Sequence, residues 1–479
     1  MTSLPLAQRR LLPPPMWLLL LTLATLGLTV LAATLPLRWA FLAVAVVIGA
    51  LALLRWPALG LCLLGVTVPF GSLYELHVGG VTVGPSELLL TATLGAVLLR
   101  GMAERSFRPF PSRLWLPLTV YTLWAALSLL RVTALTLAVK ELAKWVEFGL
   151  LLWLAATIVE RRWRYWLVVA LLVAGTAEGL LGIYQFLFRV GPEGFVLFGR
   201  YMRAHGTFLQ PNPYGGYLGL MLPMAYGCVI ALAGSVRRRE RGALALLLMS
   251  CVSGVIMAAA LMMSWSRGAL LGAIAGLALV GLWLLRRSPI VLAVLVVLAV
   301  TIVPLAARVL PGGYLGRLTG QTAYLGQDLS LVEINDDNFS TIERLAHWQA
   351  AWRMFSREPF VGVGIGQYAV VYPQVALPRW QDPLGHAHNY YLHVLAELGL
   401  IGLALLFVQG TAVPCALWRR LRTLDGWERG LAIGALGMWG HLLAHSMVDN
   451  LFVHELYLLM ALLIGLALAA AATPKETTS

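Results

Sequence analysis

Apolar runs of about 17 residues or more recur along nearly the whole chain, and each can cross about 30 Å of hydrocarbon as a helix. Only 12% of the 479 residues are charged and 59% are hydrophobic, whereas soluble domains are roughly 25% charged. All four cysteines lie within apolar runs, so they imply no disulfide framework. These features exclude a soluble domain and predict an all-α, polytopic transmembrane helix bundle.

Hydropathy divides the chain into about 12 to 14 transmembrane helices, with boundaries uncertain by several residues. The chain therefore has three parts: membrane helices over 1–306, a large loop over 307–389 and C-terminal membrane helices over 390–479. The predicted spans cover residues 17–34, 38–54, 56–70, 85–100, 114–130, 141–159, 165–188, 212–233, 242–264, 268–285, 289–306, 390–418, 429–447 and 454–473.

Lysine and arginine are unevenly divided between the two sets of alternate loops. One set, which includes both termini, carries 21 of the 35 basic residues, and basic residues in short loops favour the cytoplasmic side. We therefore expect both termini in the cytoplasm and the large loop outside. The net charge of +13 is scattered in short clusters between apolar runs, so membrane orientation explains it and no nucleic-acid partner is expected.

The large loop contains the pattern of an amphipathic helix. Ser340 and Glu343 have the spacing of a capping box, which predicts that a helix begins there and continues until Pro359. Its apolar stripe at helical spacing consists of Leu345, Trp348, Trp352 and Phe355. We expect this helix to lie on the membrane surface or to cap the bundle.

His388 is the candidate general base, because it lies at the end of the large loop immediately before a predicted span. A neutral histidine at this boundary can accept a proton from a hydroxyl group. Two alternatives remain open from position alone. His388 could be a purely structural interfacial residue, or it could bind a metal with Asp382 and His386, although that ligand set is a weak signal.

Arg203 and Arg267 are the candidate anion-binding residues on the same predicted face. Arg203 precedes the span that starts near Asn212, and Arg267 lies in the tight junction between two spans. An arginine between apolar helices is costly, and its planar fork can bind phosphate oxygens bidentately. The alternative is that these side chains extend to lipid headgroups.

Two further patterns have simpler interpretations. The glycines of residues 362–366 resemble a dinucleotide-binding loop only superficially, since no strand precedes them, and we expect a flexible turn. His393 and Glu397 are four residues apart on one helix face, which favours a hydrogen-bonded pair within the membrane.

The ordered motifs of roughly residues 200–402 resemble those of the O-antigen ligase and O-antigen polymerase superfamily. His388-Asn389, nine further residues and then Gly399-x-x-Gly402 reproduce the ligase pattern His-Asn-x9-Gly-x-x-Gly. The other matching elements are residues 203–212, Ser266-Arg267-Gly268, Arg344-x-x-x-Trp348 and residues 359–366. Each piece is short, and their order around one long external loop makes the resemblance specific.

This resemblance implies a glycosyltransferase of the bacterial cytoplasmic (inner) membrane, active on the extracytoplasmic face in lipopolysaccharide or polysaccharide biosynthesis. His388 would be the essential base, and Arg203 and Arg267 would hold the diphosphate of an undecaprenyl-diphosphate-linked glycan. The acceptor hydroxyl would belong to a lipid, a glycan or a protein, and the inverting reaction would use no metal or cofactor. The remaining substrate-binding residues on the matched motifs would be Asn212, Asn389, Arg344, Trp348 and Tyr390.

Several alternatives stay open at this level. A ligase, a polymerase and a protein O-oligosaccharyltransferase would share the donor and differ only in the acceptor. From a different class, a non-enzymatic transporter of lipid or glycan could use the same arginines to bind headgroups. Trp348 and Tyr390 could offer ring faces to sugars, but ordinary interfacial packing is the simpler interpretation.

Overall fold

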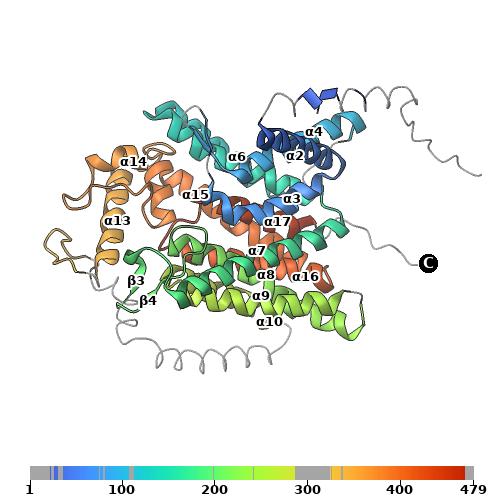
Figure 1. Ribbon diagram of the computed structural model, residues 1–479. Helices are drawn as coiled ribbons and strands as arrows, with labels where there is room; N and C mark the ends of the chain where they lie inside the picture. The colour runs from blue at the N-terminus through green and yellow to red at the C-terminus, as the bar shows by residue number, and fades with distance from the viewer. Residues whose placement is uncertain are drawn as a thin grey trace, which may run out of the picture.

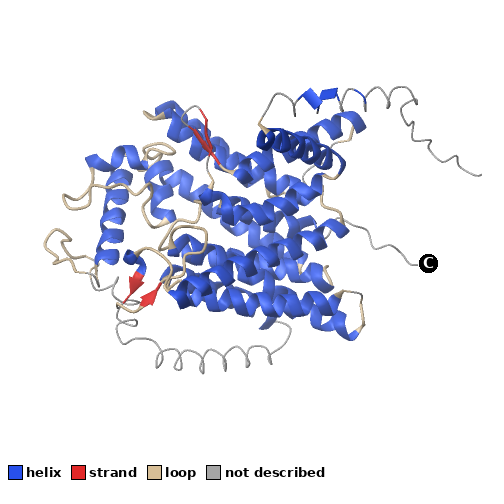
Figure 2. Cartoon of the chain, in the orientation of Figure 1, coloured by secondary structure: helices blue, strands red, loops and turns tan. Residues whose placement is uncertain are grey.

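The computed structural model is a bundle of helices with two short two-stranded sheets (Figures 1 and 2). It describes residues 22, 26–27, 29–30, 36–74, 76–78, 81–106, 113–197, 199–240, 242–285, 324, 326–335 and 338–469. β1 (Leu76–Val78) pairs antiparallel with β2 (Val81–Val83), and β3 (Val196–Leu197) pairs antiparallel with β4 (Tyr201–Met202).

The helices follow the predicted apolar runs closely. The first group comprises α2 (Leu37–Arg55), α3 (Pro57–Thr67), α4 (Pro85–Glu104), α5 (Trp115–Leu127), α6 (Leu135–Thr157), α7 (Arg161–Phe188), α8 (Pro211–Arg237), α9 (Ala243–Met263) and α10 (Arg267–Leu285). The second comprises α13 (Phe339–Arg357), α14 (Tyr368–Val371), α15 (Tyr390–Arg420), α16 (Gly426–His445) and α17 (Leu456–Ala469). Short 3-10 turns lie at Val68–Leu73, Ser128–Arg131, Glu193–Phe195 and Tyr372–Gln374.

The predicted all-α polytopic bundle is confirmed. Among the described residues, seven helices are long and apolar enough to cross a membrane, and α3 and α17 are shorter apolar helices. The predicted span at 289–306 lies outside the described residues, as does most of the one at 17–34. Every other predicted span coincides with a helix, because hydrophobic length is a local property of the chain.

Close packing of small residues sets α8 and α10 against α16. A Cβ atom at Gly227 of α8 would lie 2.5 Å from the Gly430 carbonyl oxygen, and one at Gly276 of α10 would lie 2.5 Å from that of Gly437. Glycines at helix crossings allow such backbone contact, which favours helix association in membranes. The contacts hold the first turns of α8 and α10 beside the last turn of α16, where Gly268 packs on His445.

A glycine-rich segment joins α13 and α14 to a kink in α15. Gly399 adopts φ 67° and ψ −166°, which interrupts the helix, and a Cβ atom there would overlap the Phe360 carbonyl. The Val363 N–H donates to the Ala396 carbonyl (3.0 Å), and the Leu400 N–H donates to the Pro359 carbonyl (2.9 Å). The turn expected at residues 362–366 is therefore a packed junction against α15.

Glu397 supports this junction through its carboxylate, which accepts hydrogen bonds from the backbone N–H groups of Gly366 and Tyr368, both at 2.9 Å. His393 and Glu397 lie side by side as predicted, but the contact between them is too long for a hydrogen bond. The closest nitrogen and oxygen are 3.7 Å apart, which exceeds hydrogen-bonding distance. The carboxylate is already engaged by the loop, so its role is to hold that loop on α15.

The amphipathic helix in the large loop is present as α13, but its predicted start is wrong. It begins at Phe339 after Asn338, because Asn335 and Asn338 form a local turn. The Asn335 N–H donates to Asn338 Oδ1 (2.8 Å), and the Asn338 N–H donates to Asn335 Oδ1 (3.0 Å). Ser340 consequently lies within the first turn and is not the capping residue.

The buried face of α13 also differs from the predicted stripe. Leu345 is buried as expected, but Trp352 is 55% exposed, and the buried face instead includes Ile342 and Met354. The helix packs with its small residues against α15, while the large Trp352 ring projects outward. α13 therefore caps one end of the bundle (Figure 1).

Candidate functional site

His388 lies directly before α15, in a conformation fixed by its neighbours. It adopts φ 48°, a left-handed conformation that is strained for a non-glycine residue. Its N–H donates to His386 Nδ1 (3.1 Å), and its carbonyl accepts from Trp348 Nε1 (3.2 Å). Asn389 caps α15, since its side-chain oxygen accepts from the Leu392 N–H (3.1 Å). The loop therefore fixes where the imidazole ring lies.

The imidazole of His388 is paired with a carboxylate that the sequence interpretation missed. Asp449 Oδ1 lies 3.3 Å from His388 Nδ1. A carboxylate can only accept, so this contact favours the tautomer with a proton on Nδ1 and a free lone pair on Nε2. Nε2 is buried and has no hydrogen-bond partner among the residues that the structure describes. The ring therefore keeps one unpaired acceptor nitrogen.

Asp449 lies in the turn between α16 and α17, beside the start of α15. The Tyr390 N–H donates to the Ser446 carbonyl (2.8 Å), which joins the two segments. Burial tends to raise the pKa of Asp449, but the hydrogen bond from His388 and the nearby charges of His388 and Arg344 hold the pKa well below its usual range. An ionisable residue in the short polar break between two apolar runs is the sequence signal that could have found it.

Arg203 and Asn212, both predicted site residues, are in direct contact. Arg203 Nη2 donates to Asn212 Oδ1 (2.9 Å) at the first turn of α8. Arg203 Nε donates to the Ser264 carbonyl (2.9 Å), which belongs to the turn that leads into Arg267. The side chain is half-buried and joins the starts of α8 and α10.

Arg267 and Arg344 meet at Ser340. Arg267 Nη2 approaches the Ser340 hydroxyl (3.3 Å), and Arg344 Nη1 donates to the Ser340 carbonyl (3.2 Å). The predicted residues of the bundle and of the large loop are thus brought together. Arg344 Nε is buried and has no hydrogen-bond partner among the described residues. The positive charge of Arg344 helps to lower the pKa of Asp449, so the two side chains influence each other.

Two further predicted residues, Trp348 and Tyr390, and the neighbouring His347 make hydrogen-bond and packing contacts near His388. Trp348 positions the His388 backbone, as described above. Tyr390 is only 8% exposed and stacks on Phe452 with ring centroids 5.0 Å apart. The His347 ring packs beside the His388 ring, with centroids 5.6 Å apart. His347 Nδ1 lies 3.1 Å from the Tyr368 hydroxyl. Burial lowers the pKa of His347 to about 4.

The possible metal ligands differ from the expected set. His386, His388 and Asp449 offer ligand atoms within 4.8 Å of one another, whereas Asp382 is exposed and accepts from the Leu384 N–H (3.0 Å). Each of the three side chains already uses one polar atom, because His388 Nδ1 pairs with Asp449 Oδ1 and His386 Nδ1 accepts from the His388 N–H. A cation at the trio would have to bind their other atoms or replace these contacts.

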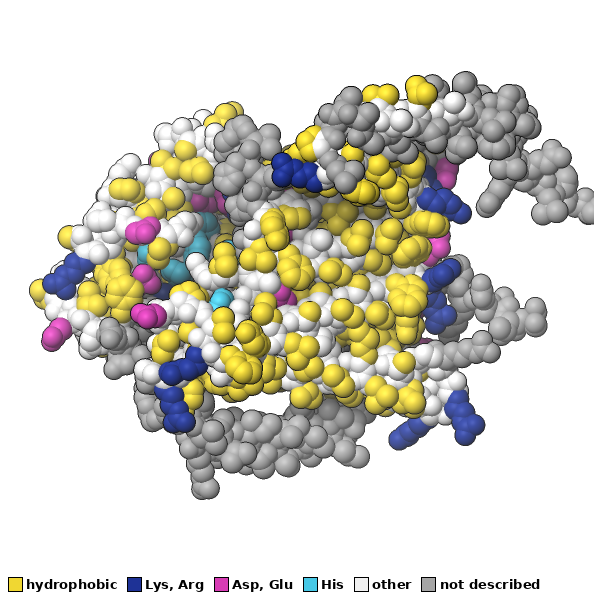
Figure 3. Space-filling model, in the orientation of Figure 1, with side chains coloured by type: hydrophobic (Ala, Val, Ile, Leu, Met, Phe, Trp, Pro, Cys, Tyr) yellow, Lys and Arg dark blue, Asp and Glu magenta, His cyan; other side chains and the backbone are white. Residues whose placement is uncertain are grey.

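Histidine side chains gather at one end of the bundle. Figure 3 shows them at the end capped by the large loop, whereas lysine and arginine occur at both ends and several line the rim of the opposite end. Together with the apolar helices, this arrangement defines a multi-pass membrane protein with a polar site at the capped end of the bundle.

Comparison with known families identifies the domain. Residues 252–407 match the family model described as O-Antigen ligase, so the chain carries a domain of the O-antigen ligase and polymerase superfamily. The match runs from α9 across the large loop into α15, and it includes Arg267, Arg344 and His388. The match covers about a third of the chain and supports a membrane protein that resembles glycosyltransferases of the ligase or polymerase type. No individual curated protein matches the chain.

Proposed function

We propose that the protein transfers a saccharide from a polyprenyl-diphosphate carrier to an acceptor hydroxyl on the extracytoplasmic face, with His388 as the base. The observation that supports this proposal is the pairing of His388 with Asp449 at the end of the bundle where Arg203 contacts the Ser264 carbonyl and Arg267 and Arg344 contact Ser340. A diphosphate needs several positive donors, and an attacking hydroxyl needs one acceptor. These side chains offer both kinds of group.

The proposed reaction is a single displacement at the anomeric carbon. As the acceptor oxygen attacks, its proton passes to His388 Nε2, and the bond between the sugar and the phosphate oxygen breaks. The bonding electrons leave on the diphosphate, whose growing negative charge the arginines stabilise. Attack opposite the leaving group inverts the anomeric configuration. No metal is required, because arginine fulfils the electrostatic role.

Asp449 would hold the ring in the productive tautomer and stabilise the imidazolium that forms. The strained backbone at His388 fits this role, because such conformations persist only where surrounding contacts impose them. Arg203 is fixed by Asn212 and the Ser264 carbonyl before substrate arrives, so little reorganisation accompanies binding.

The direct test is incubation of the purified protein with an undecaprenyl-diphosphate-linked glycan and lipid, glycan or peptide acceptors. Transfer to a lipid, chain growth, or transfer to peptide would identify a ligase, a polymerase or a protein O-oligosaccharyltransferase respectively. His388→Ala should abolish transfer while donor binding persists. Arg267→Lys keeps the charge and loses the fork, so donor affinity should fall. Movement of donor without bond cleavage would instead indicate a transporter.

A further inference from the structure

A separate polar cavity of about 700 Å³ lies at the end of the bundle opposite Arg203. It is lined by the ends of α2, α4 and α6 and by the starts of α3 and α7. α7 has 28 residues, which corresponds to a length of roughly 40 Å. Its far end reaches the Arg203 segment, where Gln185 Nε2 donates to the Gly206 carbonyl (3.0 Å). The length of the bundle therefore separates this cavity from the proposed catalytic site.

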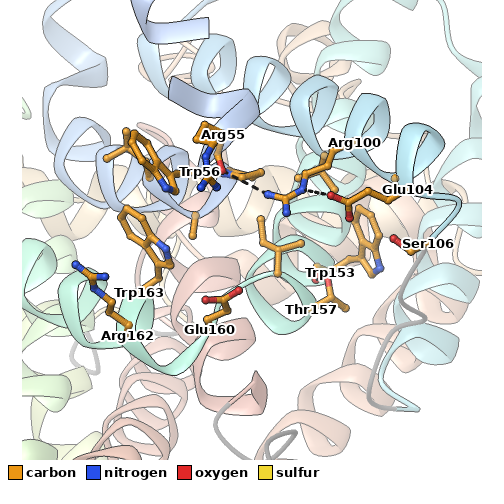
Figure 4. Close-up of a pocket in the computed structure, with 16 residues that line it drawn as sticks. Arg55, Trp56, Arg100, Glu104, Ser106, Trp153, Thr157, Glu160, Arg162 and Trp163 are labelled. Carbon is orange, nitrogen blue, oxygen red and sulfur yellow. Dashed lines mark hydrogen bonds and ion pairs between the residues drawn. The ribbon is translucent and has the colours of Figure 1, made fainter. Parts of the chain in front are cut away.

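The cavity combines arginine with tryptophan. Figure 4 shows Trp56 and Trp163 on one side of the space and Trp153 on the other, with Arg100 between them. Indole rings concentrate where membrane meets water, because they are apolar with one polar edge. On the neighbouring surface of α4, Leu99 is 56% exposed, as expected for a lipid-facing side chain. A molecule in the cavity would therefore contact polar groups and lipid-facing surface together.

The charges in the cavity are only partly balanced. Three arginines and two glutamates line it, which leaves a net charge of +1. Arg100 Nε pairs with Glu104 at 2.7 Å. The Arg55 guanidinium lies 5.5 Å from the centroid of the Trp56 ring, and none of the ion pairs among the described residues uses Arg55 or Arg162. Two guanidinium groups are therefore available to an anion.

We propose that this cavity binds the headgroup of an anionic phospholipid from the leaflet opposite His388. Arg55 and Arg162 bind the phosphate, and the indole rings contact the glycerol and the first part of the acyl chains. Basic pockets between transmembrane helices are suited to acidic headgroups, and the volume lies within the usual range for ligand sites. The lipid would join five helices at this end. This inference is independent of glycan transfer.

Binding can be measured by native mass spectrometry of the full-length protein after delipidation and titration with phosphatidylglycerol or phosphatidylcholine. A basic residue near an acidic headgroup contributes about fivefold in affinity, so Arg55→Gln and Arg162→Gln should each weaken phosphatidylglycerol binding about fivefold and together about 25-fold. Arg422→Gln is the matched control, since Arg422 is exposed in the loop between α15 and α16. It should leave binding unchanged.

Four results would overturn the proposal. Equal retention of phosphatidylcholine and phosphatidylglycerol, or equal losses in the Arg422→Gln control, would indicate non-specific lipid. Thermal stabilisation by inorganic phosphate equal to that by phosphatidylglycerol would indicate a soluble phosphate ligand. Glu160→Gln removes the cavity carboxylate that is not paired with Arg100, so it should tighten binding of an anionic lipid. Weaker binding would instead indicate a headgroup with an amine held by Glu160.

Discussion

Asp449→Asn is the most informative single substitution, because it changes one charge and almost no volume beside His388. When His388 takes the acceptor proton, an imidazolium forms 3.3 Å from the Asp449 carboxylate. At an effective dielectric constant of about 20, that charge pair is worth about 5 kcal/mol. The asparagine amide can also donate to Nδ1, which would leave the proton on Nε2 and remove the acceptor.

The effect of Asp449→Asn on the rate cannot be larger than the whole contribution of His388 as general base. General base catalysis is typically worth about 10² to 10⁴ in rate, or roughly 3 to 5 kcal/mol, which agrees with the electrostatic value. We therefore expect kcat to fall about 10² to 10⁴-fold in Asp449→Asn, with little change in donor affinity. Single-turnover transfer from a lipid-linked glycan would measure kcat separately from binding.

Two controls make this test decisive. Asp382→Asn removes an exposed carboxylate from the loop that carries His388. It should change kcat less than about threefold, as is usual for a surface substitution. If the two side chains act as a unit, Asp449→Asn should lower none of the residual transfer that a sensitive single-turnover assay detects in His388→Ala. Activity above a tenth of wild type, or additive losses in the double variant, would refute the proposed pairing.

Three further predictions concern the surrounding structure. Gly399→Ala should lower the free energy of unfolding by at least about 1 kcal/mol, because its φ of 67° is left-handed and the added Cβ would overlap the Phe360 carbonyl. Gly410→Ala, whose Cβ meets only one side chain at 4.0 Å, should leave the melting temperature unchanged. Stability should fall as pH drops from 6.5 towards 4, by up to about 1.4 kcal/mol per unit. The reason is that the unfolded chain protonates His347 while burial lowers its pKa to about 4 in the fold. A His347→Gln variant with the same pH dependence would contradict this assignment. Transfer should persist after chelation, and its loss with recovery on adding a divalent cation would indicate a metal site at His386, His388 and Asp449.

The sequence predicted the helices well because membrane insertion depends on local hydrophobic length. The predicted span at 268–285 became α10, which begins at Arg267, and that at 390–418 became α15. Local signals were less reliable where several competed. Ser340 has the spacing of a capping box, but the turn formed by Asn335 and Asn338 begins the helix earlier. A capping side chain must lie just before the first helical residue, and Ser340 already lies inside the helix.

His388, Arg203 and Arg267 could be proposed from the sequence because each is a polar residue at the edge of an apolar run, within a recognisable order of motifs. The partner of His388 could not be found in this way. Asp449 is 61 residues further along the chain, and its contact depends on α16 ending beside the start of α15. Glycine contacts between α16 and both α8 and α10 fix that position, and no local pattern encodes them.

The sequence by itself therefore determined the membrane bundle, its helices, its predicted orientation and the motifs around one large loop. Only the tertiary structure decided that Asp449 faces His388, that the charge of Arg344 acts on Asp449, and that the residues around Gly362 form a junction on α15. The physical reason is the distance along the chain over which each kind of interaction acts. Hydropathy acts within one helix, whereas the geometry of a site depends on contacts between helices that are distant in sequence.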